Sequence, residues 1–293
     1  MSWWKELRGK VKLNYSLRNH TTFKIGGPAK FFFEPEDLKD LKLLLSLSNK
    51  HKIPFFVLGA GSNILVNDKG INGIVIRLNS PYLKKIIFKN NYIEAGSGAM
   101  LHQVMYLATR HSLSGAEFLA GIPGTLGGAL VMNAGIPGEN IGDLVEKIMV
   151  MDYKGNIKTL NKKDIKFGYR SSNLSKYIIL KARLKLIKEA KKKIKHNINR
   201  YLDYRHAAQD VSLPSAGCIF KNPKAESAGR LIDLCGLKGK EIGGACVSLK
   251  HANFILNLKC AKAGDVLKLM NLIRKRVKNK FNINLETEIK IWK

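Results

Sequence analysis

The spacing of apolar residues along the chain predicts several amphipathic helices. Leucines at 38, 41, 44, 45 and 47 recur at helical spacing within 36–52, and Pro54 ends that segment. Apolar residues at 101, 104, 105 and 108 predict a second helix over 100–111. Further helices are expected at 187–206, 226–235 and 263–280, the first of them strongly basic.

Short apolar runs bounded by turn residues predict the strands. We expect strands at 53–59, 64–68 and 73–78, a pair within 82–98, a hairpin over 145–160, a strand at 177–186 and strands around 244–258. Residues 1–30 show no such pattern and are expected to be irregular. Strands that alternate with helices in this order favour a mixed α and β architecture.

Length and charge narrow the class of protein. The chain has 293 residues, and at roughly 100–200 residues per domain this suggests two domains or three small ones. Lys and Arg number 51 against 22 Asp and Glu, a formal net charge of +29. Basic residues are dense only at 181–196 and form no nucleic-acid-binding motif, so a lysine-rich surface is favoured over nucleic-acid binding. A basic cleft would attract an anionic substrate such as a nucleotide.

Targeting and metal signals are lacking. No apolar run approaches the roughly 18–20 residues of a membrane helix, and MSWWKELRGK at the start lacks the apolar core of a secretory signal. We therefore expect a cytoplasmic protein without a membrane anchor. Separately, we expect a monomer. The four cysteines, at 218, 235, 246 and 260, have neither CxxC spacing nor a histidine at ligand spacing. No metal site is predicted, and the thiols are expected to be reduced.

Two glycine-rich loops are candidates for anion binding. The first is Gly59-Ala60-Gly61-Ser62-Asn63; Ile64 stands where a Rossmann fingerprint needs a third glycine, and a strand is expected next, which excludes that fold. Its backbone amides can still form an anion nest, with Ser62 and Asn63 as side-chain donors. The second is Ile122-Pro123-Gly124-Thr125-Leu126-Gly127-Gly128, in which Thr125 is expected to cap a short helix whose N-terminus offers N–H groups to an anion.

Taken together, the two loops predict a clamp around one pyrophosphate. A glycine lets the backbone approach a bulky ligand closely, because it has no side chain to interfere. An ordinary tight turn for the first loop, and a close helix–strand contact for the second, are the alternatives.

Six ordered motifs then carry a family resemblance. They are NHTTFKIGG (19–27), LGAGSNILV (58–66), GIPGTLGGALVMNAG (121–135), FGYRSS (167–172), PSAGCIFKNP (214–223) and LETEI (285–289). In this order they resemble the UDP-N-acetylenolpyruvoylglucosamine reductases, also called UDP-N-acetylmuramate dehydrogenases, over nearly the whole chain. The short interval between the fourth and fifth motifs resembles the shorter form of the family, which lacks an extra tyrosine-bearing loop.

The resemblance implies an α+β fold with two FAD-binding subdomains of the vanillyl-alcohol-oxidase type and a C-terminal α+β substrate-binding domain. We place these at 1–79, 80–192 and 193–293; a return of the last strand to the first subdomain is the alternative. It also implies non-covalent FAD held by both glycine loops, NADPH as hydride donor, and the enolpyruvyl ether of a UDP-sugar as substrate. No separate nicotinamide domain is expected.

Three residues are implied to act in the chemistry. Hydride addition to carbon 3 of the enolpyruvyl group drives charge onto the substrate carboxylate, which requires a nearby cation and an acid that protonates carbon 2. Arg170 in FGYRSS matches the family's cation, and its planar fork suits a carboxylate; a surface arginine is the alternative. Glu288 matches the family's active-site acid, although in a strand Glu286 would share its face. It is expected to be protonated and to donate a hydrogen bond.

Cys218 stands where the family usually has a serine as proton donor. A thiol with an ordinary pKa of about 8.5 is mostly protonated at neutral pH and can donate directly. A neighbouring arginine would favour the thiolate, which cannot act as an acid. The alternative is a small residue packed under a turn.

Four further residues are candidate substrate contacts. Lys221 and Asn222 lie in the FKNP motif, with Arg205 and Gln209 upstream, and the basic pair suits a diphosphate. The family usually has proline after that glutamine, where this chain has Asp210. Two other functions remain open, namely another FAD oxidoreductase of the same fold and a basic nucleic-acid-binding protein.

Overall fold

The computed structural model describes residues 3–224 and 226–293, in two compact units. Unit 1 comprises the N-terminal segment up to Leu13, Phe31–Ala60 and Gly73–Tyr204. Unit 2 comprises Asn14–Lys30, Gly61–Asn72 and Arg205–Lys293. Each unit therefore gathers segments that are distant in sequence.

The first sheet of unit 1 has the strand order β1-β2-β5-β3. Its strands are β1 (Lys10–Ser16), β2 (Pro28–Glu34), β3 (Phe55–Leu58) and β5 (Ile71–Arg77), and β3 and β5 are parallel. Helix α1 (Leu38–Lys50) is capped at its N-terminus by Asp37, whose side chain accepts from the N–H of Asp40. Its leucines at 41, 44, 45 and 47 are buried with residues such as Phe33 and Ile74, as their helical spacing predicts.

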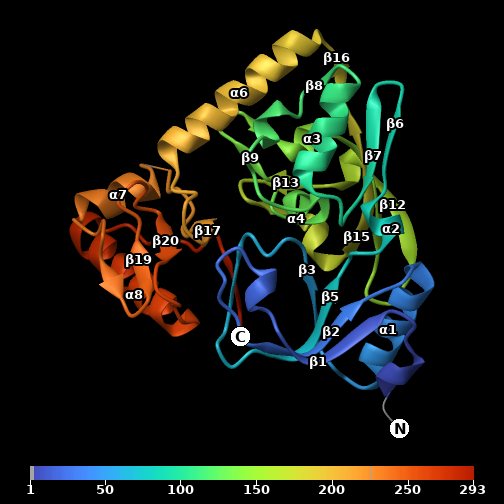
Figure 1. Ribbon diagram of the computed structural model, residues 1–293, viewed down its shortest axis with the longest axis horizontal. Coiled ribbons are helices and arrows are strands. Elements are labelled where there is room, and N and C mark those ends of the chain that lie inside the picture. Colours follow the sequence, from blue (N-terminus) through green and yellow to red (C-terminus); the bar gives the residue numbers. More distant parts are fainter. Residues whose placement is uncertain (1–2, 225) are drawn as a thin grey trace. The chain divides into compact units, whose positions relative to one another are not determined.

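The second sheet of unit 1 is antiparallel, with the order β12-β11-β15-β7-β6 (Figure 1). Its strands are β6 (Ile86–Lys89), β7 (Tyr92–Gly96), β11 (Val145–Met151), β12 (Ile157–Asn161) and β15 (Ile178–Lys185). Helices α3 (Leu101–Arg110) and α4 (Leu126–Val131) contribute Val104 and Leu130 to the same buried cluster as Ile148 and Ala182 of the sheet. The core of this region therefore lies between the sheet and these helices.

Shorter elements complete unit 1. They are α2 (Pro81–Lys84), β8 (Leu113–Ser114), β9 (Gly135–Ile136), β10 (Glu139–Asn140), α5 (Ile141–Leu144), β13 (Phe167–Gly168), β14 (Ser171–Ser172) and β16 (Ile187–Lys188), with 3₁₀ helices at Trp3–Glu6, Glu117–Leu119, Lys162–Asp164 and Asn173–Lys176. Helix α6 (Lys191–Ala208) contains the boundary between the units, at Tyr204 and Arg205.

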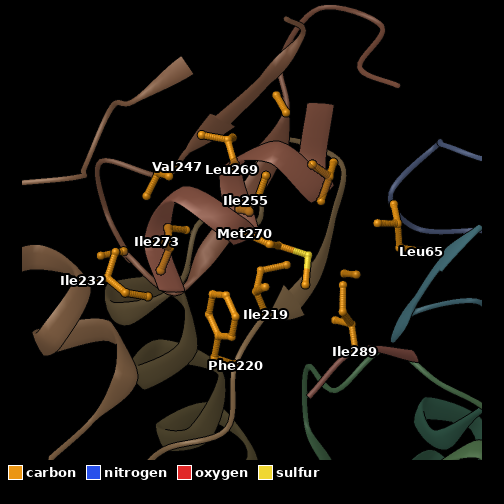
Figure 2. Packing of buried hydrophobic residues seen from close by; sticks show 14 of the residues in the cluster. Leu65, Ile219, Phe220, Ile232, Val247, Ile255, Leu269, Met270, Ile273 and Ile289 are labelled. Carbon is orange, nitrogen blue, oxygen red and sulfur yellow. The ribbon is translucent and has the colours of Figure 1, made fainter. Parts of the chain in front are cut away.

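Unit 2 is built on an antiparallel sheet of order β17-β20-β19-β18, flanked by α7 and α8 (Figure 1). The elements are β17 (Ser215–Cys218), α7 (Ala228–Leu234), β18 (Glu241–Ile242), β19 (Ala245–Val247), β20 (Phe254–Asn257) and α8 (Ala263–Phe281). In its buried core, Met270 extends from α8 toward Ile219 (Figure 2). Strand β21 (Lys290–Trp292) pairs in parallel with β4 (Ile64–Val66), and a 3₁₀ helix spans Arg18–His20.

The expected helices and most expected strands are confirmed, but the interpretation of residues 1–30 as irregular is wrong. They contain β1 and the start of β2. The side chains of β1 are exposed or half-buried along its whole length, so this strand has no buried apolar run from which to predict it. The division at 79/80 and 192/193 stays a prediction.

Candidate active site

The first glycine loop connects β3 to β4, with a strand rather than a helix after it, as expected. Gly61 has a φ of +68°, and a Cβ there would lie 2.0 Å from the carbonyl oxygen of His20. Only glycine therefore fits this position. Asn63 is fixed within unit 2, because its side chain donates to the carbonyl of Glu288 over 3.3 Å and its own carbonyl accepts from Lys290 N–H.

The second glycine loop leads into α4, and the predicted cap is confirmed. The Thr125 hydroxyl oxygen accepts from the N–H of Gly128 over 3.4 Å. The expectation that this helix offers unused N–H groups is wrong for its first turn, since Leu126 N–H donates to Ala99 and Gly127 N–H to Ser97. The segment after β7 supplies those carbonyls, and a contact so distant in sequence leaves no local signal.

The start of the first loop meets the second loop within unit 1. A Cβ on Gly59 would lie 2.7 Å from the Thr125 hydroxyl oxygen and 3.9 Å from the Cα of Gly128. Gly128 is exposed, and a Cβ on it would meet only that hydroxyl, at 3.5 Å. The result is a surface of bare backbone beside one hydroxyl donor, which fits the pyrophosphate of a dinucleotide such as FAD.

Arg170 lies at the tip of the β13–β14 hairpin in unit 1. Its φ is +51°, a left-handed conformation that is uncommon for residues other than glycine and asparagine. Its guanidinium Nη1 donates to the carbonyl oxygen of Gly135 over 3.0 Å. A position that favours glycine by conformation but carries arginine is typical of a site where the side chain matters.

Cys218 ends β17 in unit 2 and is half-buried. It pairs with Phe254 of β20 across an irregularity in the register, and the preceding Gly217 has a φ of +73°. None of the four cysteines is in a disulfide. Bulged strand ends of this kind reorient a side chain, so the geometry suits a residue presented for reaction.

Ile219, the residue after Cys218, holds the backbone of Glu288 close to the end of β17. Glu288 N–H donates to the Ile219 carbonyl over 2.8 Å, and Lys221 N–H donates to the Glu286 carbonyl over 2.9 Å. Between them, Phe220 and Thr287 form an isolated antiparallel bridge. The structure therefore brings together the segments of Cys218 and Glu288 in unit 2, whereas Arg170 belongs to unit 1.

Asn253 is a residue that sequence reasoning missed in this region. Its buried amide accepts from Phe220 N–H at 3.0 Å and donates to Phe220 C=O at 2.8 Å, while its backbone carbonyl accepts from Ile219 N–H. These bonds satisfy backbone groups that would otherwise be buried without partners. A lone asparagine before an apolar run carries no periodic signal.

The LETEI segment is not a regular strand, contrary to what its alternation suggested. Strand β21 begins only at Lys290, and Thr287 makes just the isolated bridge. Glu286 forms an ion pair with Lys221 at 3.3 Å and its side chain is 77% exposed. The two glutamates are thus distinguished by their contacts rather than by strand faces, and Lys221, a candidate for the diphosphate, already faces a carboxylate.

The remaining candidates have local structural partners. The Asn222 side-chain oxygen accepts from Ala228 N–H at the start of α7 over 3.0 Å. Arg205 lies in α6, and its carbonyl accepts from Gln209 N–H. Asp210, where the family usually has proline, builds its own turn by accepting from the Ser212 N–H and hydroxyl; these bonds hold the pKa of Asp210 below its usual value.

Two functional elements are not found within residues 3–224 and 226–293. No cluster of His, Cys, Asp and Glu there could hold a metal ion. Nor does any helix in those ranges combine the length and apolarity that a bilayer crossing requires.

Comparisons with known proteins decide the family. A model described as UDP-N-acetylenolpyruvoylglucosamine reductase, C-terminal domain, matches residues 209–292, and one described as FAD binding domain matches residues 29–161. The UDP-N-acetylenolpyruvoylglucosamine reductase of Caldanaerobacter subterraneus subsp. tengcongensis is 45% identical over 285 residues, which cover 97% of this chain and 94% of that protein. The chain belongs to the UDP-N-acetylenolpyruvoylglucosamine reductase family.

Other members of the reductase family agree in sequence and in fold. The Clostridium tetani reductase is 40% identical over 96% of this chain and 92% of its own length. The crystal structure of the Thermus caldophilus reductase matches with a TM-score of 0.83 at 37% identity, covering 98% of this chain and all of that one. Membership confirms the expected fold class and makes the chain a FAD-dependent oxidoreductase.

Proposed function

We propose that this chain reduces the enolpyruvyl ether of UDP-N-acetylglucosamine to UDP-N-acetylmuramate with NADPH, as a cytoplasmic step in peptidoglycan precursor synthesis. The observation that carries the proposal is the backbone pairing of 219–221 with 286–288, which joins two family motifs in one small region of unit 2. We further propose that the enzyme is monomeric and needs no nucleic acid.

The cofactor loops are assigned to FAD. Bound FAD supplies hydride exchange, with NADPH as donor and carbon 3 of the enolpyruvyl group as acceptor. Residues assigned to hold it are those of the two glycine-rich loops, namely Gly59, Ala60, Gly61, Ser62, Asn63, Ile122, Pro123, Gly124, Thr125, Gly127 and Gly128. The convergence of Gly59 with Thr125 and Gly128 supports this assignment.

Arg170 is assigned to the substrate carboxylate. Hydride arrival at carbon 3 pushes an electron pair through carbon 2 onto the carboxylate, and a guanidinium offers two parallel N–H donors to that charge. Such stabilisation operates only as charge develops, so it accelerates substrate reduction and not flavin reduction. The strained backbone of Arg170 supports this role.

Cys218 is assigned as the proton donor and Glu288 as a protonated hydrogen-bond donor. The thiol gives its proton to carbon 2, which completes the lactyl ether, and the thiolate is reprotonated from solvent. The Glu288 carboxyl group stays neutral so that it does not repel the developing negative charge. Their shared link through Ile219 supports a common site for the two side chains.

Substrate binding is assigned to four polar residues. Lys221 and Arg205 contribute positive charge for the diphosphate, and Asn222 and Gln209 contribute hydrogen bonds to oxygens of the sugar or diphosphate. In this assignment, diphosphate binding exchanges the Lys221–Glu286 ion pair for a contact with the substrate.

NADPH oxidation by the purified, FAD-loaded protein tests the proposal. With the enolpyruvyl UDP-sugar present, NADPH loss should be fast and stoichiometric with UDP-N-acetylmuramate. UDP-N-acetylglucosamine, which lacks the enolpyruvyl group, is the matched control. Equal rates with both sugars would contradict the proposed function.

A further inference from the structure

Asn133 has a buried side chain just after α4, in the segment that follows the second glycine loop. Its side-chain oxygen accepts from Gly142 N–H over 3.0 Å, and its side-chain nitrogen donates to the Gly168 carbonyl over 3.1 Å. Because one partner is a donor and the other an acceptor, the orientation of the amide is fixed. The residue is only 7% exposed and has a φ of +44°, a conformation that asparagine tolerates.

Gly168 is the residue at the base of the Arg170 turn. Three hydrogen bonds join this hairpin to residues 131–135: Asn133 to Gly168, Arg170 Nη1 to Gly135 at 3.0 Å, and the Ser172 hydroxyl to Val131 at 2.9 Å. The donor for the first bond is a side chain in the 131–135 segment; for the other two it is a side chain of the hairpin. All of these residues lie in unit 1.

Close packing on the other side of Asn133 restrains this arrangement. A Cβ on Gly142 would lie 2.6 Å from the Phe167 ring and 2.8 Å from the Asn133 side-chain oxygen. Phe167 and Asn133 therefore both press on the bare backbone of Gly142, and the hairpin is held from two directions. Close packing of this kind transmits a small change in one group to its neighbours.

We propose that Asn133 is a positioning residue for Arg170. Its amide connects the segment just after α4 to the turn that carries Arg170. In this way it fixes the position of the guanidinium while the backbone of Arg170 is held at positive φ. This inference rests on the function proposed above for Arg170. It predicts that loss of the Asn133–Gly168 bond slows the step in which charge develops on the substrate and spares the step in which NADPH reduces the flavin.

N133D is one variant; it keeps an acceptor for Gly142 and replaces the donor to Gly168 with a carboxylate oxygen. N133G is the second variant; glycine adopts positive φ readily, so it removes both side-chain bonds without backbone strain. The matched control is N173D. Asn173 makes the same pair of bonds at the base of the same hairpin, accepting from Lys166 N–H at 3.1 Å and donating to the Asp164 carbonyl at 3.2 Å.

The experiment measures both half-reactions of FAD-loaded enzyme by anaerobic stopped-flow absorbance. In N133D and N133G, reduction by NADPH should stay within about threefold of wild type, while reoxidation by the enolpyruvyl UDP-sugar slows at least about tenfold. N173D should match wild type in both steps.

The alternatives have different signatures. Wild-type reoxidation in N133D and N133G overturns the inference. Equal slowing of both half-reactions, or loss of FAD from both variants, assigns Asn133 a purely structural role and also overturns it. Failure of the wild-type enzyme itself to be reoxidised by the substrate overturns the proposed function, and this inference with it.

Discussion

The backbone N–H of Glu288 donates to the carbonyl oxygen of Ile219 over 2.8 Å, directly after Cys218. This bond joins the C-terminal motif to the motif that carries the thiol. It is flanked by the bond from Lys221 N–H to the Glu286 carbonyl and is supported by the buried Asn253 amide. The positions of the assigned acid and proton donor are thus coupled through the backbone.

The first prediction concerns Cys218. C218A should be reduced by NADPH at about the wild-type rate but be reoxidised by the enolpyruvyl UDP-sugar at least about tenfold more slowly, because no side chain protonates carbon 2. C218S should retain much activity. Wild-type turnover should fall at alkaline pH, where the thiol becomes a thiolate that cannot donate a proton, and C218S should lack this loss. Wild-type reoxidation in C218A would eliminate the thiol as the proton donor.

The second prediction concerns the strained backbone of Arg170. R170G should relieve a left-handed conformation that costs about 1 kcal/mol, which offsets the loss of the Arg170–Gly135 hydrogen bond, so the variant should unfold in urea close to wild type. Its reoxidation by substrate should nevertheless be nearly abolished. K52G is the control: Lys52 also has positive φ, at +53°, just after α1. It should gain stability and keep both half-reactions. Marked destabilisation by R170G would argue that the arginine serves the fold.

The third prediction separates cofactor binding from folding at Gly128. A Cβ there meets only the Thr125 hydroxyl, at 3.5 Å, and alanine favours a helix by about 1 kcal/mol over glycine. G128A should therefore raise the stability of FAD-free protein while weakening FAD binding. G264A, in the first turn of α8, should leave FAD binding unchanged. Titration with FAD, followed by fluorescence quenching, measures the FAD affinity of both variants. Undiminished affinity in G128A would remove Gly128 from the cofactor site.

The sequence predicted these sites to different degrees. The cap at Thr125 follows from local residue types, and the six motifs identify Arg170, Cys218 and Glu288. No local pattern encodes the tertiary contacts by which the α4 amides reach the carbonyls of Ser97 and Ala99. The same is true of the pairing of Lys221 with Glu286. The positive φ of Arg170 was equally hidden, because the residue type argues against it.

The fourth prediction concerns pH and stability at Glu94. Burial raises the pKa of Glu94, but hydrogen bonds from Lys181 at 2.7 Å and Arg183 at 3.3 Å outweigh it, and the pKa is lowered overall from 4.5. The stability from this group is therefore present at neutral pH and lost as pH falls below about 4.5. At pH 7 the free energy of unfolding of E94Q, measured in urea, should be about 1 kcal/mol lower than that of wild type. This difference should shrink in acid.

E189Q is the control for this effect, because Glu189 pairs with Lys193, whose side chain is 64% exposed. Its unfolding midpoint should change less than that of E94Q. A difference between E94Q and wild type that stays constant from neutral to acidic pH would contradict the electrostatic account.

The central claim is tested most directly by one single-turnover measurement. FAD-loaded wild-type enzyme is reduced anaerobically with one equivalent of NADPH and then mixed with the enolpyruvyl UDP-sugar. The account predicts that oxidised-flavin absorbance returns in one turnover, with one equivalent of UDP-N-acetylmuramate formed. Flavin that stays reduced in the presence of this substrate, and is reoxidised only when oxygen is admitted, would contradict it.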